Sequence, residues 1–484
     1  MKESNYVRSV KTLVTKIHGR SVLADSLYEM AEEYFKKQAK VEEQRLQLQH
    51  QINTTKKSLG SEEGKKQAKI EAYLETQNKT LKKFEQDQLL RRLERQQHLQ
   101  QICLEILALS EDENNQETQL KSAKLLGTLF MMTPEQGRKV PLQNMFSKHL
   151  YKAVLSLRLL DQLLVNDNVI DTFVTSRLVD PAESSGDGAK YTRFDLEVKI
   201  PMLMAALAQD IGRMHPDAQR ILFGESGNED EFRVLDPVDR VNLLKLTYQQ
   251  GLAFITDGIG MPNYVGNSKS ERQSFYKNEQ AKLDFTLKLI KNAVNPKNGI
   301  GNVLKIPQVY TSVVLSTKSN QAIEYIPKVA MMLRSGAEKK LFSTTATEAL
   351  LQITGLFPQG FGLSYIPKEF ELRDIDRFEY AIVSRLYPNK QDEPICRKVT
   401  RNMEYHARGN DCVISKNYNL YFPPARKALQ VVKKERLLEI LKQLVSNFEE
   451  RKDQDLLPRC WHPYHYFEQA KFQNLWNKMT ITRN

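Results

Sequence analysis

The sequence predicts a mainly α-helical protein with a small antiparallel β module followed by a helix near its C-terminus. Three observations predict this fold class. Residues 21–58 are rich in Ala, Glu, Gln, Lys and Leu and hold no proline, residues 120–367 place apolar side chains at helical intervals, and residues 378–422 alternate and are rich in Val, Ile and Tyr. A chain of 484 residues has room for about three domains of roughly 100–200 residues each. We expect them at 1–119, 120–367 and 368–484.

The first segment reads as a helical hairpin or coiled coil. "LGSEEGKK" (59–66) interrupts the helical composition with two glycines, which suit a turn between helices, and "SEDENNQET" (110–118) is a polar linker. The spacing of the apolar residues drifts, so a long heptad repeat is only partly supported. This stripe consists of Ile70, Leu74, Leu81, Phe84, Leu89, Leu93, Ile102 and Ile106. We predict an antiparallel pair of helices that packs on itself or on a second subunit, which would make a homodimer.

The second segment predicts an all-α domain with polar surface loops. Its apolar positions recur at helical spacing, as in Leu155, Leu159 and Leu163. The polar stretches 180–192 and 223–232 read as loops between buried helices. Residues 294–310 add a glycine-rich turn.

The third segment predicts a short antiparallel β meander. Residues 378–388, 395–407 and 412–422 alternate, and "NKQDEP" and "RGND" separate them as turns. Residues 425–452 then read as one amphipathic helix that starts just after Pro423 and Pro424.

The net charge and the cysteine content limit the partners and the cellular compartment that this protein is expected to have. The net charge is +12, and residues 368–484, with 22 basic and 16 acidic side chains, carry half of this excess. A net positive charge of this size suits an anionic partner, which could be nucleic acid, a membrane surface or a small ligand. The four cysteines show no CxxC spacing, which favours a reduced cytoplasmic protein. We find no apolar run long enough for a transmembrane segment and no signal peptide, so we expect a cytoplasmic location.

The middle segment resembles the HD superfamily, and within it the HD-GYP cyclic-di-GMP phosphodiesterases, in a degenerate form. Four anchors spread over about half of the chain carry the resemblance. They are "FSKHLYKAVLSLRLLDQLL" (146–164), "MAALAQDIGRMHPDAQRIL" (204–222), "LDPVDRVNLLKLTYQQG" (235–251), and "LKIPQVYTSVVLSTK" (304–318) together with residues 322–361. The resemblance implies an all-α fold and, in active members, a metal centre that hydrolyses a cyclic dinucleotide.

Carried over position by position, this metal site is largely lost. His149 and Asp210 match family ligands. Gln209, Thr247 and Gln308 stand where the family has a histidine, a second histidine and an aspartate. The lysine that contacts phosphate in the family corresponds to Arg213, which is the phosphate-contact candidate here. No histidine lies near 290–301, where the family's "GYP" element is expected.

These losses matter because phosphodiester hydrolysis in such a site needs divalent metals to activate water and hold the phosphoryl oxygens. Such metals, two of manganese or iron in an active member, take imidazoles and carboxylates, and a glutamine amide is a feeble substitute. We therefore predict no metal and no catalytic residue. Simpler structural roles remain open for the matching residues: Asp210 can cap or pair with Arg213, and His149 can be a hydrogen-bonded core histidine.

The expected function is that of a non-catalytic signalling or interaction protein, linked to cyclic-di-GMP through the resemblance. Its partners would be a protein, held by the helical hairpin and the C-terminal module, and a cyclic dinucleotide bound near Arg213. Two alternatives stay open. One is an active metal-dependent HD-type phosphodiesterase that uses His149 and Asp210. The other is a basic nucleic-acid-binding adaptor, which rests on the C-terminal basicity and its interleaved tyrosines.

Overall fold

A computed structural model describes most of the chain in two compact units. The described residues are 3–59, 63–169, 171–178, 191–297, 299–318, 321–367, 376–444, 448–451, 455–476 and 481–483. The first unit consists of Met1–Thr15, Cys103–Ala206 and Lys288–Asn484, and the second of Lys16–Ile102 and Leu207–Leu287. Each unit therefore draws on segments that are distant in sequence.

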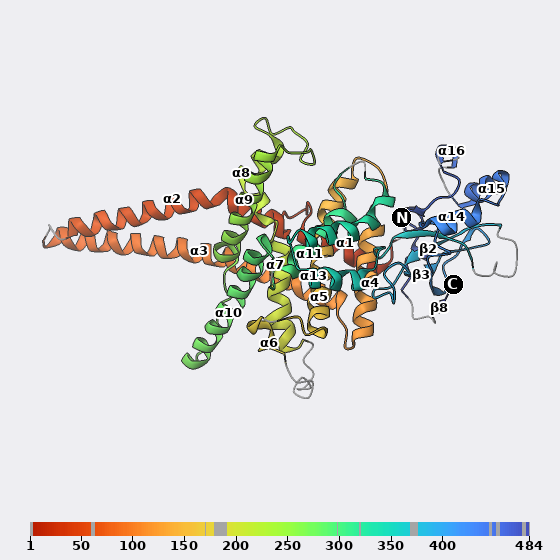
Figure 1. The fold of residues 1–484 in the computed structure, drawn as a ribbon. Helices are drawn as coiled ribbons and strands as arrows, with labels where there is room; N and C mark the ends of the chain where they lie inside the picture. The colour runs from red at the N-terminus through yellow and green to blue at the C-terminus, as the bar shows by residue number, and fades with distance from the viewer. Residues whose placement is uncertain are drawn as a thin grey trace. The chain divides into compact units, whose positions relative to one another are not determined.

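The second unit contains the predicted helical hairpin. Helix α2 (Leu27–Leu59) and helix α3 (Lys65–Ser110, in this unit up to Ile102) lie side by side over much of their length (Figure 1). Gly64 has a φ of +65° just before α3, a conformation that glycine adopts without strain. Ile52 of α2 and Gln77 of α3 are buried along this pair, while most of their neighbours are exposed. The prediction of two long helices that reverse near residues 59–66 is confirmed.

The rest of the second unit is a set of shorter helices. Ala218 and Leu222 pack on Leu243 and form a small apolar cluster between two of these helices. The predicted loop over 223–232 is present, and its backbone is closed by a hydrogen bond from Glu229 N–H to Phe223 O of 2.9 Å. The elements are η2 (Ile211–Met214), α8 (Pro216–Phe223), α9 (Pro237–Ala253), η3 (Phe254–Ile259) and α10 (Lys269–Val294), of which α10 belongs to this unit up to Leu287.

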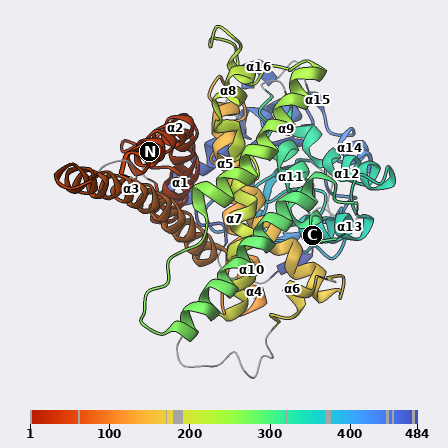
Figure 2. The same ribbon diagram turned by 90° about the vertical axis from the view of Figure 1, so that its left-hand side faces the viewer.

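Helix α5 (Val140–Val165) is the centre of the first unit. It packs against α4 (Asn115–Met131), α11 (Asn302–Val314) and α13 (Thr344–Thr354) (Figures 1 and 2). Most of its leucines are buried, and they lie on several sides, as expected of a helix that is apolar around most of its circumference. The other helices of this unit are α1 (Asn5–Ile17, up to Thr15), α6 (Thr172–Thr175), η1 (Asp195–Lys199), α7 (Ile200–Ala208, up to Ala206), η4 (Ile323–Lys328), α12 (Val329–Glu338), α14 (Pro423–Leu429), α15 (Lys434–Leu444), α16 (Phe448–Arg451), α17 (Tyr464–Phe467) and η6 (Ala470–Phe472).

The C-terminal part of the first unit carries the β structure. One sheet has the strand order β7-β1-β2-β3-β6-β8, in which all neighbours are antiparallel except β6 and β8. A separate pair joins β4 to β5. The strands are β1 (Gly362–Tyr365), β2 (Glu379–Val383), β3 (Ile395–Lys398), β4 (Thr400–Arg401), β5 (Glu404–Tyr405), β6 (Asp411–Val413), β7 (Cys460–Trp461) and β8 (Ile481–Arg483).

The sheet corrects the predicted meander in four ways. It also includes β1, β7 and β8, which lie outside residues 378–422, and the pair β6–β8 is parallel. The strand predicted over 395–407 instead reverses at Asn402 and Met403, whose φ angles of 51° and 65° fit a tight hairpin turn. Strands β2, β3 and β6 pair antiparallel in the predicted order, but β6 begins at Asp411 in the predicted turn and ends at Val413, long before the end of the strand predicted over 412–422.

The helix predicted over 425–452 is divided into α14, α15 and α16. Gln430 ends α14, and Val431 and Val432 follow; β-branched residues lose side-chain freedom in a helix and weaken it.

The predicted linker over 110–118 is shorter than expected, because Asn114 caps α4 by accepting a hydrogen bond from Glu117 N–H at 2.9 Å. The loop predicted over 180–192 lies almost wholly outside the described residues. In the part of the chain that is described, no helix combines the length and apolar character needed to cross a bilayer.

Candidate functional site

The segment around Asp210 is a tight connection between helices in the second unit. Asp210 precedes η2, and the Arg213 backbone N–H donates to the Asp210 carbonyl at 3.1 Å. Pro216 then starts α8, which His215 caps by accepting a hydrogen bond on Nδ1 from Asp217 N–H at 3.2 Å. Gln209, Asp210 and Arg213 are all half-buried.

Two glycines bring this connection against α9. A Cβ atom on Gly212 would lie 2.2 Å from the Thr247 carbonyl oxygen, so only glycine fits at this position. Gly251, one turn further along α9, lies near the Ala208 carbonyl, 3.4 Å from a built Cβ. Thr247 and the segment with Asp210 therefore pack directly on each other, which places three of the residues singled out from the sequence on adjoining elements.

His18 and Tyr28 occupy the neighbourhood of Asp210. Their rings stack with centroids 4.1 Å apart and an interplanar angle of 15°, and the Tyr28 hydroxyl donates to the Leu207 carbonyl at 3.1 Å. His18 is 8% exposed and Tyr28 is 1% exposed. Asp210 and Arg213 act electrostatically on both rings, so all four side chains share one region.

The electrostatics of this cluster keep His18 neutral. Burial lowers the pKa of His18 to about 3; the positive charge of Arg213 contributes in the same direction, and Asp210 opposes it. Burial also raises the pKa of Tyr28 well above its ordinary value, with Asp210 adding to the effect. The Arg213 guanidinium can bind a phosphate group and the Asp210 carboxylate can orient a water, but the stacked rings of His18 and Tyr28 are buried in protein.

Sequence reasoning missed His18 and Tyr28. They lie more than 180 residues before Asp210, and neither stands in a pattern that the family resemblance includes. The only signal was the position of a histidine at the end of an amphipathic helix, in "KIHGR" (16–20). Such a signal is too weak to assign a residue to a site.

The remaining candidate residues lie in the first unit. His149 is 5% exposed on α5, and Gln308 of α11 accepts a hydrogen bond from Lys305 Nζ at 3.4 Å. The five positions carried over from the family are thus divided between the units, with Gln209, Asp210 and Thr247 in the second. Over the described ranges, no three His, Cys, Asp or Glu side chains are grouped as a metal ion would require.

No family model, curated protein or solved structure matches this chain. The resemblance to the HD-GYP family therefore rests on the residues quoted above and on no wider similarity.

Proposed function

We propose that this protein is a non-catalytic interaction protein built on a degenerate HD-GYP-like domain. The observation that supports this most strongly is the stacked, buried pair of His18 and Tyr28 beside Asp210. An active phosphodiesterase needs open coordination positions and a route for substrate at this carboxylate. Two stacked aromatic rings, both buried, lie in the electrostatic reach of this carboxylate instead.

The experiment is to measure metal content and turnover in the same preparation. Elemental analysis should find no stoichiometric manganese, iron or zinc, and cyclic-di-GMP incubated with added Mn²⁺ should stay intact. The proposal is wrong if the protein holds about two metals per chain and linearises the dinucleotide, with both properties lost in Asp210→Ala. Asp217→Ala is the matched control, because Asp217 is an exposed carboxylate of the same segment.

The helical hairpin is the surface that we assign to a protein partner. Leu46, Tyr73 and Leu90 are 53%, 58% and 52% exposed on α2 and α3, although the two helices are already paired. These exposed apolar side chains are positions that a further helix would bury. A second copy of this hairpin is the simplest such partner, since it would offer the same apolar positions. The basic C-terminal module is a further surface for a partner.

One observation favours nucleic-acid binding as a second candidate function, on a surface other than the one predicted from the sequence. Lys65, Lys69, Lys79 and Lys83 are exposed on α3. At the α-helical period they fall within an arc of about 80° and span about 27 Å of helix. Lys79 also pairs with Glu75 at 2.7 Å, an exposed ion pair that is weak. A row of lysines with this reach can follow a phosphate backbone.

Salt titration separates this candidate from a solvated helix face. If α3 binds duplex DNA, replacing the four lysines by glutamine should flatten the dependence of log affinity on log salt by about one per lysine. Lys36→Gln with Lys37→Gln is the control, because both lysines are paired with glutamates one turn away. The candidate is rejected if the four-lysine variant and the control have the same slope of log affinity against log salt. It is also rejected if the four-lysine variant loses binding to anionic vesicles but keeps binding to DNA.

A further inference from the structure

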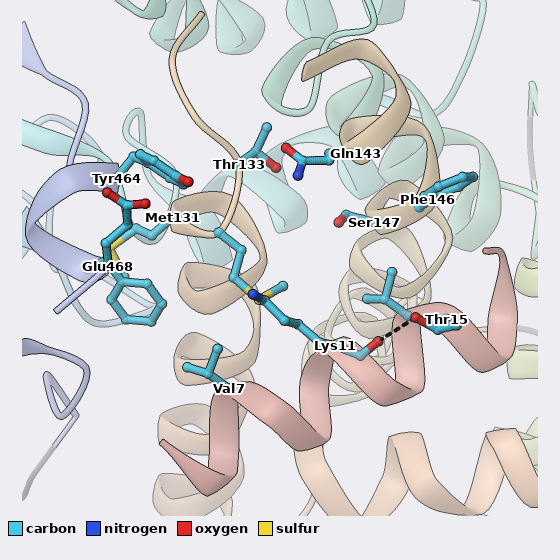
Figure 3. A pocket seen from close by; sticks show the side chains of 13 residues that line it. Val7, Lys11, Thr15, Met131, Thr133, Gln143, Phe146, Ser147, Tyr464 and Glu468 are labelled. Carbon is cyan, nitrogen blue, oxygen red and sulfur yellow. Dashed lines mark hydrogen bonds between the residues drawn. The ribbon is translucent and has the colours of Figure 1, made fainter. Parts of the chain in front are cut away.

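A pocket of about 330 Å³ lies in the first unit, and none of the candidate site residues considered above lines it. Figure 3 shows it between α1, the end of α4, the start of α5 and α17. This volume is near the lower end of the roughly 300–1,000 Å³ usual for small-molecule sites. It suits a compact ligand rather than a cyclic dinucleotide.

The pocket has an apolar lining. Val7, Met131 and Phe467 are buried there, with exposures of 1%, 0% and 2%, and Met132 and Phe146 continue the apolar surface. Methionine side chains are unbranched and polarisable, so they adapt to ligands of varied shape. A flexible hydrocarbon chain is the kind of ligand body that such a lining favours.

Two residues with hydroxyl groups line the pocket. Thr133 and Ser147 are 4% and 5% exposed, and both line the pocket. A hydroxyl can donate one hydrogen bond and accept two, so each can bind a ligand or a water there. Gln143 adds an amide on the same side of the pocket (Figure 3).

The pocket is lined by one positively charged residue, Lys11, and one negatively charged residue, Glu468. Lys11 of α1 lines it and pairs with Glu3, while Glu468 lies on the opposite side from Ser147, beside Tyr464 (Figure 3). Glu468 is paired with His465, whose ring is exposed. An anionic head group is attracted to Lys11 and the hydroxyls, and it is repelled by Glu468.

We propose that this pocket binds a small amphipathic carboxylate, such as a medium-chain fatty acid. The carboxylate accepts hydrogen bonds from Lys11 and Ser147, and the chain lies against Met131 and Phe467. This binding site is independent of the proposed interaction function, because it uses none of the residues near Asp210 or on the hairpin.

Titration calorimetry of the full chain with octanoate tests the proposal. Octanoate should bind, and octanol and octylamine should bind at least about tenfold more weakly, because only the carboxylate has a charge-assisted partner. Lys11→Met should weaken octanoate binding by about tenfold or more. Ser147→Ala should weaken it by a few-fold, since one hydrogen bond to a charged group is lost.

Two further variants separate binding from folding. Glu3→Gln removes the same ion pair as Lys11→Met but leaves the lysine available, so it should keep or increase octanoate affinity. Lys36→Met removes a comparable exposed ion pair elsewhere and should change nothing. Absence of octanoate binding, equal binding of octanol, or equal losses in Glu3→Gln and Lys11→Met would each overturn the proposal.

Discussion

His18 carries a pH dependence that is large for a single side chain. Its pKa is about 3 in the folded protein because the ring is buried, whereas its ordinary value is 6.5. Between these values the unfolded chain binds a proton that the folded chain does not, so stability is full above about pH 6.5 and falls as the pH drops toward 3. We expect the free energy of unfolding to fall by about 2 kcal/mol between pH 7 and pH 5 from this group alone.

Urea denaturation at the two pH values measures this effect. His18→Phe keeps a ring against Tyr28 and should lose that part of the pH dependence. His50→Gln, at an exposed position on α2, should retain it. If His18→Phe has the same pH dependence as the wild type, His18 is not held neutral by burial.

Gly212 is a second residue whose identity is dictated by its surroundings. A methyl group there would meet the Thr247 carbonyl at 2.2 Å, and both partners are backbone, so the segment with Asp210 would have to move away from α9. We expect Gly212→Ala to destabilise the second unit by about 1–3 kcal/mol. Gly251→Ala is the matched control, since its Cβ would make an ordinary contact and alanine favours a helix. A melting experiment in which the two variants behave alike would contradict the close approach.

At the scale of the element, one buried carboxylate joins strands β3 and β6 to the segment that follows β2. Asp411 of β6 is 0% exposed and accepts hydrogen bonds from Arg397 Nε of β3 at 2.6 Å and from Arg385 Nη2, after β2, at 2.7 Å. Removing its charge takes away the buried carboxylate that both arginines bind. We expect Asp411→Asn to destabilise the first unit by about 3–5 kcal/mol, measured by denaturant unfolding. Asp392→Asn, which breaks an exposed pair with Lys416, should cost less than about 1 kcal/mol.

The helices and strands also differ in how well the spacing of apolar residues along the sequence predicts them. Helices α2, α3 and α5 are long and have clear composition or apolar spacing, so their existence could be predicted from local sequence. Strands β7 and β8 have two and three residues and pair with strands far away in sequence, so no local pattern marks them. The same limit applies to the site. The segment of Asp210 was singled out from its motif, whereas His18 and Tyr28 are brought into its electrostatic reach only by tertiary packing.

At the scale of the whole molecule, the hairpin is the part that can be shortened without rebuilding a core. Arg45, whose pKa is raised first by Glu42 and also by Glu85, faces Glu85 across the helix pair. Few residues between these two positions are buried. The distal hairpin, residues 46–84, can be replaced by a linker of about five Gly and Ser residues between Arg45 and Glu85. Such a linker is long enough to span two packed helices about 10 Å apart. Because little apolar surface is lost, the rest of the protein should keep its melting temperature within a few degrees.

Light scattering after size exclusion then tests whether the distal hairpin mediates self-association. We expect the full chain to form a dimer and the shortened chain to be a monomer. A triple variant, with Leu46, Tyr73 and Leu90 replaced by glutamine, keeps both helices but removes the exposed apolar side chains, so it should also dissociate. Thr54→Ser, at an exposed polar position of the same hairpin, should leave the dimer intact. A full chain that is monomeric, or a dimer that survives both changes, would show that the hairpin does not pair with a second copy.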